Sequence, residues 1–78
     1  MTILTQSGRQ YIFSIDEKSN MLRVNGGPKD LLITDINNIY IGENAIIKGY
    51  LIDPLTQSPM TKLGKFHFTT SRVVKILP

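Results

Sequence analysis

The 78-residue chain has no cysteine, no tryptophan, a single alanine and a single histidine. Without cysteine it has no disulfide framework, no thiolate zinc site and no cysteine nucleophile. Alanine is the strongest helix former, whereas the β-branched residues favour strands. Isoleucine, valine and threonine together number 21. The composition therefore predicts an all-β protein.

Long apolar runs are also missing. None exceeds three residues, as in 45–47, so we expect no transmembrane helix. Residues 1–8 have neither a basic start nor a long apolar stretch, so we expect no signal peptide. The lack of cysteine fits a reducing compartment. We therefore expect a cytoplasmic protein that does not contact membranes.

The apolar residues that are present alternate with period two, which is typical of strands. A chain of this length forms one domain, here residues 1–78. Asn25-Gly26-Gly27-Pro28 is the strongest break. We predict a small antiparallel barrel or sandwich of 5–7 short strands, with strands at 2–5, 11–15, 21–24, 31–33 and 39–41, 45–52, 63–69 and 73–77.

Residues 45–77 resemble SH3-like barrels in topology, and we favour that architecture. Two long strands are joined by a loop over 53–61, and a short last strand ends the chain. Thr69-Thr70-Ser71 lies where such barrels often have a single helical turn. A short helical turn at Thr34–Asn38 is a further expectation. This resemblance implies a fold and no function.

The chain ends resemble small uncharacterised proteins of phages and bacterial mobile elements. Thr5-Gln6-Ser7-Gly8-Arg9-Gln10-Tyr11 has their Ser-Gly turn followed by Tyr. Thr70-Ser71-Arg72-Val73-Val74-Lys75-Ile76 has their Thr-Ser-x-Val-x-x-Ile ending. Such proteins are often stoichiometric binders or structural accessories. The resemblance implies a place in the cytoplasm of a bacterial host cell.

Residues suited to catalysis are few. His67 is the only histidine, and no serine has the context of a nucleophile elbow. The acids lack the spacing of a calcium loop, and no phosphate-binding loop is present. Gly26–Lys29 is better explained as a plain loop than as an anion site. We predict a non-enzymatic protein with no catalytic residues, no metal and no cofactor.

One strand suggests a partner surface. Residues 45–52 are apolar on both sides, and a strand of this kind needs cover on both sides. A barrel interior buries one side, formed by Ala45, Ile47 and Leu51. The other side predicts contact with a protein partner or a second subunit, unless a long loop folds over it. Its residues are Ile46, Lys48, Tyr50 and Ile52.

Charge is unevenly spread along the chain. Residues 54–78 hold four basic side chains and no acid. A basic stripe on one hairpin is typical of nucleic-acid contacts. The residues that would contact phosphates are Lys62, Lys65, His67, Arg72 and Lys75.

The sequence thus favours a non-enzymatic protein-binding module, an accessory protein that binds a host or phage protein stoichiometrically or forms a homodimer. A small nucleic-acid-binding barrel is the first alternative. A structural component of a virion, which would assemble into a ring or larger oligomer, is the second.

Overall fold

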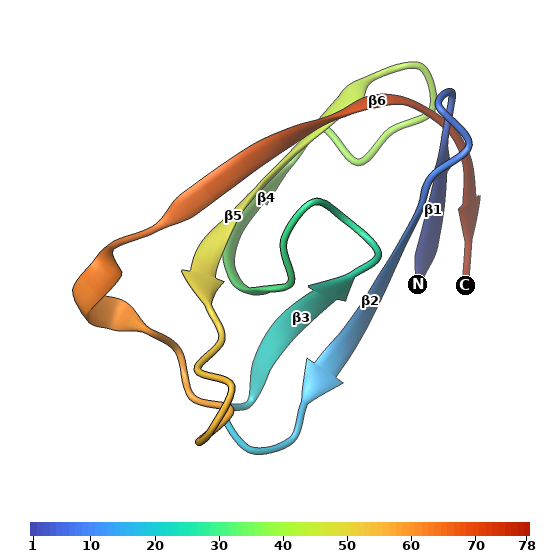
Figure 1. Ribbon diagram of the computed structural model, residues 1–78. Helices are drawn as coiled ribbons and strands as arrows, with labels where there is room; N and C mark the ends of the chain where they lie inside the picture. Colours follow the sequence, from blue (N-terminus) through green and yellow to red (C-terminus); the bar gives the residue numbers. More distant parts are fainter.

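The computed structural model describes all residues, 1–78, and contains six antiparallel strands that close into one barrel (Figure 1). The all-β prediction is confirmed. Each strand pairs with its neighbours in the chain, and the last strand pairs with the first. The strands are β1 (Thr2–Thr5), β2 (Gln10–Asp16), β3 (Met21–Asn25), β4 (Leu31–Asn37), β5 (Asn44–Leu51) and β6 (Phe66–Leu77), with one 3-10 turn, η1 (Thr61–Leu63), before β6.

Strand β6 closes the barrel by pairing with two neighbouring strands, one after the other. Its first half pairs with β5, from Phe66 opposite Gly49 to Arg72 opposite Asn44. Its second half pairs with β1, from Val73 opposite Thr5 to Leu77 opposite Thr2. The register shifts in both halves, as it does at β-bulges, which bend a strand. One twelve-residue strand therefore runs across the top of the view in Figure 1 and then bends down beside β1.

The helical turn predicted at Thr69–Ser71 is wrong, because these residues belong to β6. The analogy with SH3-like barrels fails at this point. Thr70 is buried, its hydroxyl accepts the backbone N–H of Ala45 at 3.1 Å, and its carbonyl accepts the side-chain amide of Asn44 at 2.9 Å. These bonds pair backbone groups that the shifted register would leave without partners. The polar triplet therefore marks a bend within a strand.

Three other predicted elements differ from the structure. Residues 34–38 form no helical turn, since β4 continues to Asn37 with a register shift between Ile33 and Asp35. The predicted strand at 39–41 belongs to the loop between β4 and β5. The start of the predicted strand at 63–69 is wrong as well, because η1 and Gly64 precede β6.

The barrel interior is filled by the residues that alternate inward. Tyr11 and Phe13 are buried on β2, and Ala45 and Ile47 are buried on β5, as their period-two pattern predicts. Tyr11 stacks on Phe68 with ring centroids 5.7 Å apart. The buried core comprises Ile3, Tyr11, Phe13, Val24, Leu31, Ile33, Ala45, Ile47 and Val73.

The loop between β3 and β4 lies against the barrel. A Cβ atom on Gly27 would lie 2.9 Å from the Phe68 ring and 3.0 Å from the Tyr11 ring. A Cβ on Gly26 would lie 2.2 Å from the carbonyl oxygen of Gln10. The two glycines are therefore required by close packing. This packing accounts for the two glycines in the sequence break.

Two glycines allow this packing to be measured. Gly26 and Gly42 have nearly the same positive φ, 90° and 91°, but a Cβ on Gly42 would meet nothing within 4 Å. Gly42→Ala should cost only the backbone strain, about 1–2 kcal/mol. Gly26→Ala should cost about 1–3 kcal/mol more because of the clash. Urea unfolding of both variants measures the difference, and equal losses would contradict the packing of this loop.

Candidate binding surfaces

The structure places Ile46, Lys48 and Tyr50 on the outer side of β5. Ile46 lies opposite Thr69 on β6, and Lys48 lies opposite His67. Ile46 is 36% exposed and Lys48 is exposed, while Tyr50 and Ile52 are half-buried. Ile52 lies beyond the end of β5, where it pairs with Pro59. We name the outer side formed by Ile46, Lys48, Tyr50 and Ile52 the β5 face.

Part of the β5 face is covered by the chain itself. Leu32 lies between Arg23 and Tyr50 in register on the outer side of the sheet, yet it is fully buried. The segment that returns from β5 reaches this region, because Arg23 donates to the side chain of Gln57 at 3.3 Å. Lys18 also donates to a carbonyl of this segment. The long loop therefore supplies some of the cover that the apolar strand needs.

One ion pair lies beside the β5 face. The ammonium of Lys65 lies 3.4 Å from the Asp35 carboxylate and 5.9 Å from the centre of the Tyr50 ring. Lys48 lies opposite Asp35. The hydroxyl of Thr34 donates to Asp35 at 2.8 Å, and this bond, followed by the one from Lys65, lowers the pKa of the Asp35 carboxyl. The ion pair of Lys65 and Asp35 therefore lies at the border of the β5 face, whose own cation, Lys48, forms no salt bridge.

The residues predicted to bind nucleic acid lie along a single strand and its approach. Lys62 is in η1, Lys65 precedes β6, and the other three lie on β6, all of them exposed. They do not form the predicted hairpin stripe, because β6 does not turn back. Of the Lys and Arg side chains among them, Lys65 alone has a carboxylate within 4 Å. The five residues are Lys62, Lys65, His67, Arg72 and Lys75.

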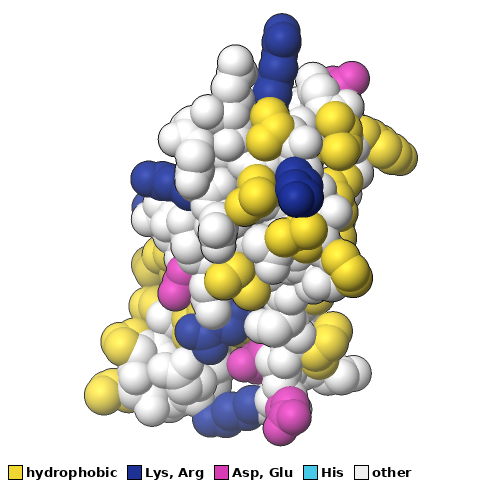
Figure 2. All heavy atoms as spheres, turned by 90° about the vertical axis from the view of Figure 1, so that its right-hand side faces the viewer, with side chains coloured by type: hydrophobic (Ala, Val, Ile, Leu, Met, Phe, Trp, Pro, Cys, Tyr) yellow, Lys and Arg dark blue, Asp and Glu magenta, His cyan; other side chains and the backbone are white.

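A second apolar surface, absent from the sequence-based predictions, lies across β1, β2 and the end of β6. Leu4 on β1 is opposite Lys75 on β6. The next outward residue of β1, Thr2, pairs with Leu77 on β6 and with Ile12 on β2. Ile12 is 46% exposed and Val74 is 50% exposed. Figure 2 shows hydrophobic side chains gathered around a basic one on this side of the molecule. We name Leu4, Ile12, Val74 and Leu77 the apolar face.

The loop between β4 and β5 extends this surface. Tyr40 is 69% exposed and Ile41 is 64% exposed. The loop is fixed to β6 by two hydrogen bonds, from the N–H of Gly42 to Val73 O at 2.7 Å and from the N–H of Val73 to the carbonyl of Glu43 at 2.8 Å. The loop therefore lies beside Val74, next to the apolar face. Such contiguous exposed apolar groups are typical of interaction sites.

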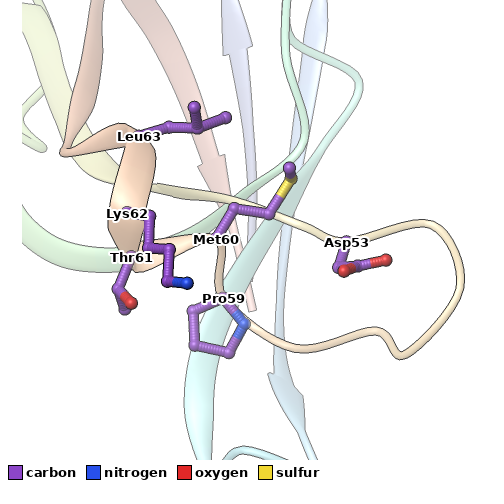
Figure 3. Close-up of a pocket in the computed structure, with 6 residues that line it drawn as sticks. All are labelled: Asp53, Pro59, Met60, Thr61, Lys62 and Leu63. Carbon is purple, nitrogen blue, oxygen red and sulfur yellow. The ribbon is translucent and has the colours of Figure 1, made fainter.

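The hollow drawn in Figure 3 has a volume of about 340 Å³ and lies in the return from β5 to β6. It contains one carboxylate and one ammonium, which form no ion pair. Nowhere does the structure gather three or more side chains suited to metal binding, and none of its helices has the length and hydropathy to span a bilayer. The lining residues are Asp53, Pro59, Met60, Thr61, Lys62 and Leu63.

No family model, no curated protein and no solved structure matches the chain. The assignment of a function therefore rests on the chemistry of these surfaces.

The lowered pKa of Asp35 predicts a pH dependence of stability. Folding favours the ionised carboxylate of Asp35, so the carboxylate stabilises the folded protein at pH values above 3.8, the pKa of the unfolded chain. This stabilisation is lost as the pH falls through the lower pKa of the folded protein. Asp35→Asn should flatten this part of the acid profile. Thermal melts between about pH 7 and pH 2 measure it. Asp30→Asn is the control, because Asp30 forms no ion pair or side-chain hydrogen bond. Superimposable profiles for wild type and Asp35→Asn would refute the assignment.

Proposed function

We propose that this chain is a non-enzymatic binding module that acts by stoichiometric contact with a protein partner through the apolar face. The observation that carries the proposal is the exposure of Ile12 and Val74, each about half exposed, beside Leu4 and Leu77 on a fully paired sheet. Burying such side chains contributes about 25 cal/mol per Å². A partner that covers them gains this energy without reordering the sheet.

Barrel closure determines how a partner can bind. Every strand has a neighbour on both sides, so the sheet has no end strand to which a partner strand could add. Recognition then depends on outward side chains. The apolar face is better suited to this than the β5 face, which the return loop partly covers and an ion pair borders.

The resemblance of the chain ends to phage and mobile-element proteins supports a biological setting for this activity. In that setting the protein is an accessory factor in the cytoplasm of a bacterial host, and its target is a host or phage protein. A virion component would instead assemble with copies of itself into a ring or larger oligomer. Light scattering separates the two, since the accessory role does not require such an assembly.

The proposal predicts that a charge on the apolar face abolishes partner binding. Ile12→Asp should reduce retention of a partner from host lysate at least about tenfold, because it buries an unpaired carboxylate in the contact. Ile46→Asp on the β5 face is the matched control and should retain the partner. Quantitative affinity capture measures both, with circular dichroism to confirm folding. Loss of the partner with Ile46→Asp alone would move the site to the β5 face.

A second candidate function, nucleic-acid binding, is supported by the exposed cations along β6. Lys62, Arg72 and Lys75 have no carboxylate within 4 Å. If they contact phosphates, Arg72→Ala and Lys75→Ala should each reduce the salt slope of oligonucleotide binding by about one. Fluorescence anisotropy with single- and double-stranded oligonucleotides measures this. The absence of binding at about 50 mM salt would eliminate this candidate.

A further inference from the structure

We infer that the partner presents an aliphatic surface that carries a carboxylate, which pairs with Lys75. This inference rests on the proposed function and specifies the partner's chemistry. Lys75 lies opposite Leu4 within the apolar face, and its ammonium forms no salt bridge and no hydrogen bond within the chain. It is therefore a cation surrounded by apolar groups.

Covering the apolar face changes the surroundings of this ammonium. A partner that excludes water from Leu4 and Val74 also removes water from Lys75 between them. Taking a charged group out of water costs several kcal/mol unless an opposite charge and hydrogen bonds replace the water. The carboxylate of an Asp or Glu on the partner supplies both. An entirely apolar partner would leave the ammonium unpaired.

The neighbouring charges favour the same kind of partner. Strands β1 and β6 contain no acid, and the one acid of β2, Asp16, lies at its far end. Arg72 and Arg9 add positive charge at the other end, where the N–H of Gln6 bonds to the carbonyl of Arg72. Neither arginine forms a salt bridge. Glu43 in the adjoining loop offsets only part of this charge.

The charges argue against two other occupants. In a second copy, a two-fold axis would bring two positively charged faces together, in a chain whose net charge is already +3. An anionic bilayer is held by clusters of roughly four to eight basic residues. This face and its border have three, namely Arg9, Arg72 and Lys75. An acidic, aliphatic protein surface fits the face better.

The test is selection from a random peptide library against wild type, Lys75→Glu and Lys62→Glu. Lys62→Glu is the matched control, because it makes the same charge change in η1, away from the apolar face. Wild type and Lys62→Glu should enrich peptides that combine Asp or Glu with Leu, Ile or Val. Lys75→Glu should lose this preference and bind the selected peptides at least about tenfold more weakly. Retention of the acidic preference by Lys75→Glu would overturn the inference.

A second variant distinguishes failure of the inference from failure of the proposed function. Ile12→Asp should abolish binding of the selected peptides. Peptides that still bind Ile12→Asp would contradict the proposed function itself. Peptides that Ile12→Asp loses but that carry no acidic preference would contradict only the inferred carboxylate.

Two further measurements address the alternative occupants. Light scattering over a concentration series should show a monomer. A dimer that Val74→Asp dissociates and Lys75→Glu does not affect would overturn the inference in favour of a second copy. Vesicles of phosphatidylserine and phosphatidylcholine should not bind the protein more tightly than the selected peptides do. Tighter vesicle binding that Lys75→Glu abolishes would identify an anionic membrane instead.

Discussion

The pairing of β6 with β5 and then with β1 is the constraint on which the rest of the structure depends. Without the second pairing, β1 and β6 would each be the open edge of a sheet. The bend that permits it is stabilised at Thr70, whose hydroxyl and carbonyl accept hydrogen bonds from the start of β5. Ser71 adds a contact to the turn after β1, where its hydroxyl accepts the N–H of Ser7. Side chains of the bend thus join both neighbours of β6.

This closure also creates the proposed binding surface. It brings the two ends of the chain together, so that Leu4 lies opposite Lys75 and Thr2 lies opposite Leu77. The register shift next to this pairing accompanies the exposure of Val74, while Val73 remains fully buried. The apolar face is therefore a product of long-range pairing. Folding and formation of the surface depend on the same contacts.

The sequence predicted the features that depend on local patterns, such as which side chains of a strand point into the barrel. Alternation in β2 places Tyr11 and Phe13 inside, and the same rule separates Ile47 from Ile46 on β5. The turn predicted at Thr69–Ser71 is wrong, because small polar residues suit a chain reversal and a bulge equally well. The residues of the β5 face could be predicted because all four come from the single predicted strand at 45–52. The apolar face was missed because its residues come together only when β1 meets β6.

The interior of the protein has no polar side chains that lack partners, so contacts with other molecules depend on surface side chains. No buried side-chain nitrogen or oxygen lacks a hydrogen-bond partner, and the core cluster is entirely hydrophobic. The carboxyls with lowered pKa values, Asp16 and Asp35, are bonded to neighbouring side chains on the surface. The polar and apolar groups that can still form new contacts therefore lie on the surface. At the apolar face, the proposed partner would cover the aliphatic side chains and pair the ammonium of Lys75 with a single complementary surface.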